Sequence, residues 1–289
     1  MATQKERDQV TGTETTGHEW DGIKELNTPL PRWWLGIFYA CIVWSIGYWI
    51  VMPAWPMIHS YTTGVLNHSQ RDDVAAAVKA LRDARAAKEH ELGGATLEQI
   101  LKNADLQQFA MAEGKAAFGD NCTPCHGSGG QGGHGYPNLN DDVWLWGGTL
   151  EDIQRTITVG VRSTSPETRS SQMPAFGRDG LLKPEQIDDL TEYVVHLSRR
   201  TADAKAVART TKLFAENCSS CHGNAGKGDR QYGAPNLTDN EWLYGPTRED
   251  IHEQIWSGRG GVMPTWGGRL SPETIKALAV YVHSFGGGE

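Results

Sequence analysis

The chain contains the pentapeptide Cys-x-x-Cys-His twice, and no other feature restricts its fold as strongly. The side chains concerned are Cys122, Cys125, His126, Cys218, Cys221 and His222. Two thiols at this spacing can bond the two vinyl groups of one porphyrin, and the histidine that follows can bind its iron. A zinc site needs four converging ligands and a thioredoxin-like site needs a βαβ pattern, and neither explains a histidine at the same place in both copies. The motifs predict two covalently bound haem c groups and a role in electron transfer.

A second constraint is the uncharged segment of twenty residues at positions 33–52. As a helix it would be roughly 30 Å long, which matches the hydrocarbon core of a bilayer. Trp33, Trp34, Trp49 and Trp55 gather at its two ends, as is typical of membrane interfaces. A cleaved signal peptide would have a shorter apolar core, a basic start near Met1 and a small-residue cleavage site. We therefore predict a retained transmembrane helix.

The distribution of basic residues predicts the orientation of this helix. Lys5, Arg7, Lys24 and Arg32 precede it, whereas the twenty residues after it contain only Arg71. Because basic residues favour the cytoplasmic side, residues 1–32 are expected in the cytoplasm and the haem motifs in the periplasm. This single-pass arrangement in a bacterial inner membrane agrees with haem attachment outside the cytoplasm.

The part of the chain that carries the haem motifs is an internal duplication. Each copy has a phenylalanine four residues before its motif, then a glycine-rich loop, a Met-Pro loop and a helix that begins with proline. The paired positions are Phe118 and Phe214, Pro137 and Pro235, Trp144 and Trp242, Ile153 and Ile251, Met173 and Met263, and Pro184 and Pro272. Similarity in this order over some ninety residues indicates one small domain present twice.

These observations predict an all-α protein, because no segment shows sustained strand alternation. We expect a cytoplasmic segment at 1–32, a transmembrane helix at 33–52 and a periplasmic helical linker at 53–110. Two tandem haem domains should follow at 111–200 and 201–289. Phe118 should meet Tyr193, and Phe214 should meet Tyr281, where the first and last helices of each domain cross.

The sixth ligand of each iron is predicted from the duplication. Met173 and Met263 stand in the same loop context, and a thioether favours ferrous iron and raises the reduction potential. The other histidines of the two repeats do not recur at matching positions; they are His134, His196, His252 and His283. We expect each methionine to serve the haem of its own repeat, and a crossed arrangement stays open.

Paired positions in the two repeats also suggest residues that contact the proximal histidines or the haem propionates. Pro137 and Pro235 should lie beside the proximal histidines, where a backbone carbonyl could accept a hydrogen bond from Nδ1. Trp144 and Trp242 either donate an indole N–H to a haem propionate or pack in the core.

The residues before the span carry a further resemblance. Residues 20–27 read WDGIKELN and residues 29–34 read PLPRWW, and they lead into one span and two haem modules. This arrangement resembles the dihaem membrane-anchored subunit III of cbb3-type cytochrome c oxidases, the CcoP/FixP family, over essentially the full chain. The resemblance implies two class I-like cytochrome c domains with Met173 and Met263 as distal ligands. Some members of the family have two spans, and this chain has one.

The resemblance also implies partners and a function. The chain would form a complex with a haem–copper catalytic subunit and a monohaem c-type subunit. It would pass electrons to the catalytic subunit from a cytochrome c or a quinol-oxidising complex, and it would catalyse no reaction alone. The cytochrome subunit of a periplasmic dehydrogenase is an alternative, and so is a dihaem peroxidase with one open iron position. A net charge of −8 argues against a nucleic-acid partner.

Overall fold

The computed structural model describes residues 6–286, and Lys5 of the basic N-terminal set lies outside them. The described chain is mostly helical, which confirms the predicted class, with one apolar helix near its N-terminus. It divides into two compact units that meet in sequence between Asp83 and Ala84.

The N-terminal unit begins with an antiparallel hairpin that the sequence analysis missed. Strand β1 is Thr15–Trp20 and strand β2 is Ile23–Leu26, with Trp20 opposite Ile23. Asp21 and Gly22 connect them with φ angles of 51° and 86°, as a two-residue turn with a left-handed backbone requires. The strands lack the alternation of apolar and polar residues that predicts a strand. The Asp21-Gly22 pair, which is typical of a hairpin turn, was the sequence feature that could have predicted them.

The predicted transmembrane segment is helix α1, Arg32–Val51, and none of its residues is buried within the protein. The segment after it returns to the end of the helix, where the amides of Val65 and Leu66 donate to the carbonyls of Ile50 and Val51 at 2.9 and 3.1 Å. Residues in the last turn of a helix lack intrahelical partners for their carbonyls, so this loop satisfies two of them. Helix α2, Gln70–Gly94, follows.

The C-terminal unit contains the remaining helices in the described part of the chain. They are α3 Leu97–Lys102, α4 Ala104–Asn121, α5 Thr123–His126, α6 Leu150–Val159, α7 Pro184–Leu197, α8 Ala204–Asn217, α9 Ser219–His222, α10 Arg248–Ser257 and α11 Pro272–His283. Side chains of Thr149, Thr247 and Ser271 accept hydrogen bonds from backbone amides in the first turns of α6, α10 and α11. Such caps explain where these helices begin.

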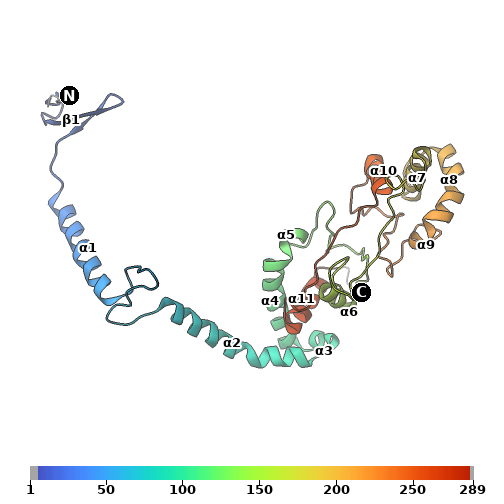
Figure 1. Ribbon diagram of the computed structural model, residues 1–289, viewed down its shortest axis with the longest axis horizontal. Coiled ribbons are helices and arrows are strands. Elements are labelled where there is room, and N and C mark those ends of the chain that lie inside the picture. Colours follow the sequence, from blue (N-terminus) through green and yellow to red (C-terminus); the bar gives the residue numbers. More distant parts are fainter. Residues whose placement is uncertain (1–5, 287–289) are drawn as a thin grey trace. The chain divides into compact units, whose positions relative to one another are not determined.

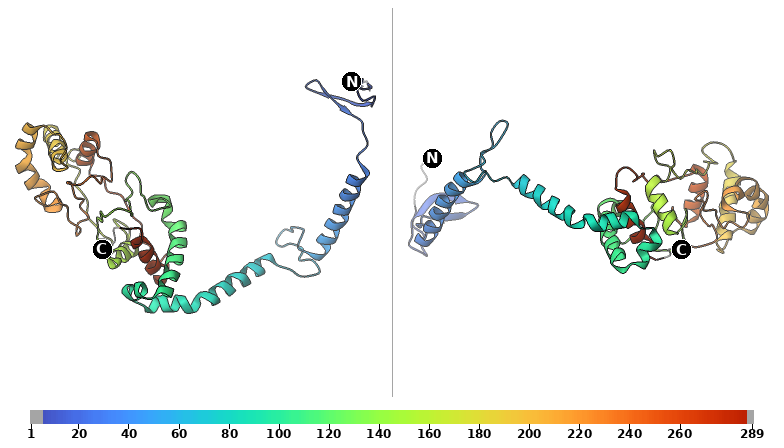
Figure 2. Two further views of the ribbon diagram at one scale, coloured as in Figure 1. Left: turned by 180° about the vertical axis from the view of Figure 1, so that it is seen from behind. Right: turned by 90° about the horizontal axis from the view of Figure 1, so that it is seen from below.

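Helices of the two repeats are exchanged in the packing. Helix α4 of the first repeat packs on α11 of the second, and α7 of the first packs on α8 of the second (Figures 1 and 2). Likewise, α6 contacts α11 and α10 contacts α7. We call the group of α3–α6 and α11 lobe A, and the group of α7–α10 lobe B. Each lobe therefore contains parts of both sequence repeats.

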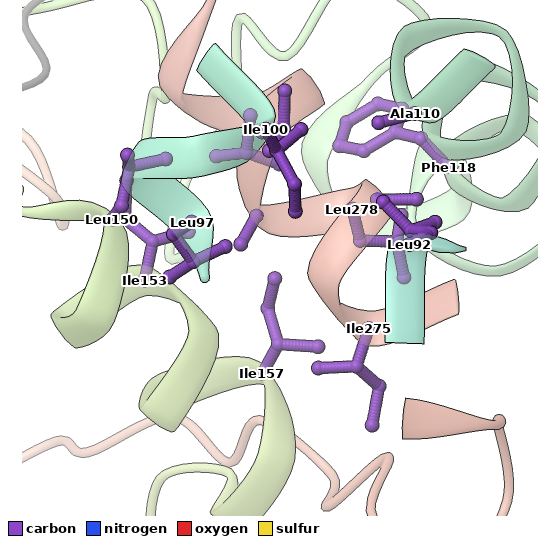
Figure 3. Packing of buried hydrophobic residues seen from close by; sticks show 14 of the residues in the cluster. Leu92, Leu97, Ile100, Ala110, Phe118, Leu150, Ile153, Ile157, Ile275 and Leu278 are labelled. Atoms are coloured by element: carbon purple, nitrogen blue, oxygen red, sulfur yellow. The ribbon is translucent and has the colours of Figure 1, made fainter. Parts of the chain in front are cut away.

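Each lobe has its own apolar core. Lobe A buries Phe118 with residues from α3, α6 and α11, as Figure 3 shows. Leu92, Leu97 and Ile100 belong to this core, although they precede the expected start of the first domain. The core of lobe B contains Phe214 of α8 and Leu190 of α7, together with other apolar residues of α7 and α10.

The exchange shows that the predicted aromatic pairs are wrong. The Phe118 ring lies 5.6 Å from that of Tyr281, and the Phe214 ring lies 4.9 Å from that of Tyr193. The types of residue are as expected, but each phenylalanine meets the tyrosine of the other repeat. Only residues 198–203 separate α7 from α8, and helices joined by so short a connection commonly pack side by side.

Gly114 tests the contact between α4 and α11. A Cβ atom there would lie 2.3 Å from the carbonyl oxygen of Ala277, whereas a Cβ at Gly119 on the same helix would meet nothing within 4 Å. We expect Gly114→Ala to lower the free energy of unfolding by about 1–3 kcal/mol through overpacking. Gly119→Ala should raise it by about 0.5–1 kcal/mol, because alanine favours the helix. Chemical denaturation of the full chain in detergent, followed by circular dichroism, measures both. Equal effects of the two variants would contradict the α4–α11 contact.

Candidate haem sites

Both haem motifs have the same local structure. Helix α4 is followed directly by Cys122, whose carbonyl accepts hydrogen bonds from the amides of Cys125 at 3.1 Å and His126 at 2.9 Å. The second motif repeats this turn, with distances of 3.3 and 2.9 Å from Cys221 and His222 to Cys218. Residues four apart lie on one face of a helical turn, so each motif presents its first thiol and its imidazole on the same side. All four thiols are free.

The proximal histidines are oriented as predicted. Nδ1 of His126 lies 3.0 Å from the carbonyl oxygen of Pro137, and Nδ1 of His222 lies 3.0 Å from that of Pro235. An N–H donated from Nδ1 leaves the Nε2 lone pair available to a metal. Burial lowers the pKa of both imidazoles, although the bonds to the proline carbonyls act in the opposite sense. The hydrogen bond from Nδ1 orients each ring, and the lowered pKa favours its neutral form. A neutral imidazole is the form that binds a metal.

The first cysteine of each motif is shielded from water. Burial, and secondarily the neighbouring Cys125 or Cys221, raises the pKa of Cys122 and of Cys218 to about 11. The thiolate is the reactive form of cysteine, so the raised pKa makes these two thiols less reactive near neutral pH.

Lobe B contains a cavity in which the second haem motif meets Met173. Cys218 and His222 line it together with Met173, and apolar side chains form most of the wall. These include Phe176, Leu190, Val194, Phe214, Leu237, Trp242, Ile251 and Ile255. An apolar cavity with thiol, imidazole and thioether groups matches what an iron porphyrin attached by a Cys-x-x-Cys-His motif requires. The residues present therefore fit haem c.

Met173 belongs to the first repeat, so the expectation that each methionine lies with the motif of its own repeat is wrong. Met263 of the second repeat likewise packs against the lobe A core, against which Cys122 of the first motif also packs. Each methionine therefore lies in the lobe that holds the haem motif of the other repeat, which is the placement that crossed ligation would require. Its physical reason is the exchange of α7 and α11, because each Met-Pro loop leads directly into one of these helices.

Backbone hydrogen bonds hold each methionine loop against the other repeat. Met263 and Val161 exchange two of them, both of 3.0 Å. In lobe B the amides of Phe176 and Gly177 donate to the carbonyls of Ile255 and Trp256, both at 3.2 Å. These bonds attach the Met173 loop to the end of α10 and the Met263 loop to the end of α6.

Glycine is required where these loops approach the helix ends. Gly160 and Gly258 end α6 and α10 with φ angles of 71° and 60°. A Cβ at either position would lie 2.4 Å from the carbonyl oxygen of Met263 or Met173, respectively. The two contacts are equivalent under the duplication, so both methionine loops are held in the same way.

Sequence analysis did not identify the polar residues of the lobe B cavity, among them Arg162 and Gln254. Arg162 donates from Nε to the Gly261 carbonyl at 2.6 Å and from Nη1 to the Ser171 carbonyl at 2.8 Å. Burial lowers its guanidinium pKa. Met173 follows Gly160 by 13 positions, whereas Met263 follows Gly258 by 5, so Arg162 lies in a stretch that only the first repeat has. The longer segment between Gly160 and Met173 was therefore the sequence feature that could have drawn attention to Arg162.

The unpaired histidines do not enter this cavity. His134 lies against Tyr244, with 6.0 Å between ring centres, and His252 lies 3.3 Å from the Asp188 carboxylate. Among the described residues, none of the four further histidines of the two repeats lines the lobe B cavity. Trp242 lines that cavity, and Trp144 packs against the lobe A core.

Three family profiles cover most of the chain. Residues 12–59 match the N-terminal domain of cytochrome oxidase-cbb3, FixP; residues 111–198 match cytochrome c; and residues 205–282 match cytochrome c oxidase, cbb3-type, subunit III. The chain is 56% identical to the cbb3-type cytochrome c oxidase subunit FixP of Bradyrhizobium diazoefficiens, with both chains covered completely. It belongs to the FixP/CcoP family.

Further relatives agree. The chain is 53% identical to FixP of Azorhizobium caulinodans, over 98% of this chain and 96% of the relative. It is 48% identical to CcoP of Azospirillum brasilense, over 99% of each chain. As a FixP/CcoP protein, the chain is an electron-transfer cytochrome subunit of a cbb3-type oxidase, which confirms the predicted family and function. The two cytochrome c domains of the family imply haem c binding.

Gly258 tests how the Met173 loop is held. Gly258→Ala places a Cβ against the Met173 carbonyl and should lower the free energy of unfolding by about 1–3 kcal/mol beyond the cost of the backbone conformation. Gly268→Ala is the matched control, because Gly268 has a φ of 79° and an added Cβ there meets nothing within 4 Å. That control should cost only the left-handed backbone, about 1–2 kcal/mol. Denaturant titration of both variants gives the difference, and equal losses would argue against a tight contact.

Proposed function

We propose that this chain carries electrons through two haem c groups, one in each lobe, with crossed axial methionines. The lobe A haem would be held by Cys122, Cys125, His126 and Met263, and the lobe B haem by Cys218, Cys221, His222 and Met173. The observation that carries the proposal is that Met173 lines the same cavity as Cys218 and His222.

Bound haem iron supplies one-electron oxidation and reduction. Met173 and Met263 close the position at which a substrate would bind, which favours electron transfer over peroxidase chemistry. The bonds from Nδ1 of the two histidines to Pro137 and Pro235 fix the imidazole rings. Apolar side chains line the cavity at the second motif, and backbone hydrogen bonds hold both methionine loops against helix ends, so we expect little rearrangement when the charge changes. These properties serve fast electron transfer rather than catalysis.

The membrane helix and the family support a place for the chain in the oxidase. Residues 1–32 would lie in the cytoplasm, and the C-terminal unit would lie in the periplasm of a bacterial inner membrane. Electrons would enter from a cytochrome c or a quinol-oxidising complex. They would leave toward the haem–copper catalytic subunit, beside a monohaem c-type subunit.

Replacement of each methionine tests the crossed ligation. A Cys125→Ser background tags the lobe A haem, because a haem with one thioether keeps a vinyl group and absorbs at longer wavelength. Met263→Leu should then lower the potential of the tagged haem, and Met173→Leu should lower that of the untagged haem. Each shift should be a sizeable part of the ~0.8 V range that axial ligands cover. Spectroelectrochemical titration of the detergent-solubilised protein measures both, and the reverse assignment would contradict crossed ligation.

The proposed orientation predicts which part of the chain a protease can reach. Protease added to intact spheroplasts should remove the haem-bearing C-terminal unit and leave a fragment that contains the hairpin β1–β2. Protease added to inverted vesicles should remove the hairpin and leave haem staining on a nearly full-length band. A haem-bearing unit protected in spheroplasts would contradict a periplasmic location.

A further inference from the structure

The side-chain amide of Gln254 reaches the sulfur of Met173. Gln254 lies on α10 and lines the lobe B cavity. Its Nε2 lies 3.8 Å from Met173 Sδ and 2.9 Å from the carbonyl oxygen of Arg259. Its Oε1 is buried and has no hydrogen-bond partner among the described residues.

The orientation of this amide follows from its surroundings. An amide NH2 has two hydrogens, so Nε2 can donate to the Arg259 carbonyl and to Met173 Sδ together. Exchange of the amide nitrogen and oxygen would place Oε1 against the Arg259 carbonyl, where two acceptors would repel. The observed orientation therefore directs a donor at the sulfur, at the cost of a buried acceptor.

Lobe A lacks this donor. Ile153 and Ile157 in α6 correspond to Ile251 and Ile255 in α10, so Thr156 occupies the position of Gln254. The hydroxyl of Thr156 is buried without a hydrogen-bond partner, so this position supplies no donor to Met263 Sδ. The duplication thus compares two equivalent positions, of which one donates to a methionine sulfur and the other does not.

We propose that Gln254 is a positioning residue that orients Met173 and makes the two haems electrochemically unequal. A hydrogen bond to the thioether sulfur withdraws electron density from it and weakens its donation to iron. Weaker donation disfavours the ferric state more than the ferrous state, so the potential of the lobe B haem rises above that of the lobe A haem. Electrons would then pass downhill from lobe A to lobe B. The inference rests on the proposed ligation of the lobe B haem by Met173.

The test removes the donor and keeps the ligand. Gln254→Leu replaces the amide by an apolar group of similar size and removes the buried acceptor, so folding should be preserved. In the Cys125→Ser background, titration of the full chain should show a lower potential for the untagged lobe B haem alone. Thr156→Val is the matched control, and it should leave both potentials unchanged.

A second variant tests the same hydrogen bond in lobe A, so the conclusion does not depend on whether Gln254→Leu folds correctly. Thr156→Gln installs an amide beside Met263 and should raise the potential of the tagged lobe A haem, which narrows the gap between the two haems. Unchanged potentials in both Gln254→Leu and Thr156→Gln would overturn the role of Gln254.

The two proposals fail in distinguishable ways. If Met173→Leu lowers the lobe B potential while Gln254→Leu does not, the ligation stands and the positioning role is wrong. If Met173→Leu leaves the lobe B spectrum and potential unchanged, the ligation itself is wrong. The charge-transfer band of methionine-bound ferric haem provides a readout that does not depend on oxidase turnover.

Discussion

The reciprocal attachment of each methionine loop to the other repeat is the constraint on which the C-terminal unit depends. Val161 pairs with Met263 through two backbone hydrogen bonds, and Phe176 and Gly177 bond to the end of α10. Each loop continues into α7 or α11, so these contacts also decide which helix closes which core. Neither lobe has a complete core without residues of both repeats.

Because each lobe contains helices of both repeats, the two haem motifs belong to one interleaved structural unit rather than to two independent domains. Two tandem domains on a flexible connection could move apart, whereas here separation of the two repeats would take each methionine away from the haem motif with which it packs. The distance between the two sites is therefore controlled by secondary structure rather than by a linker. An electron carrier benefits, because transfer between cofactors depends steeply on their separation. The duplication also provides equivalent positions that can differ in chemistry, as Gln254 and Thr156 do.

The sequence predicted the local chemistry well and the pairing of the repeats poorly. The membrane helix, the closing helices and the bonds from His126 and His222 to proline carbonyls all follow from short-range patterns. The partner of Phe118 does not, because repeats identify equivalent positions but not which copy supplies them. Tyr193 and Tyr281 satisfy the same pattern, and only the short α7–α8 connection favours one pairing. The hairpin β1–β2 was missed because its signal is confined to a turn of two residues.

The connectivity of the two lobes has a consequence for biosynthesis. Lobe B is continuous in sequence, from the Met173 loop through α10, so all its parts are synthesised in one stretch. Lobe A is interrupted: its haem motif emerges early, but Met263 and α11 emerge last. The core beside the haem motif nearest the N-terminus is therefore incomplete until the C-terminal residues have been synthesised. A chain truncated before α11 would keep the helices of lobe B but lose the C-terminal helix that completes the lobe A core. Truncation at the C-terminus would therefore damage the lobe that holds the first haem motif.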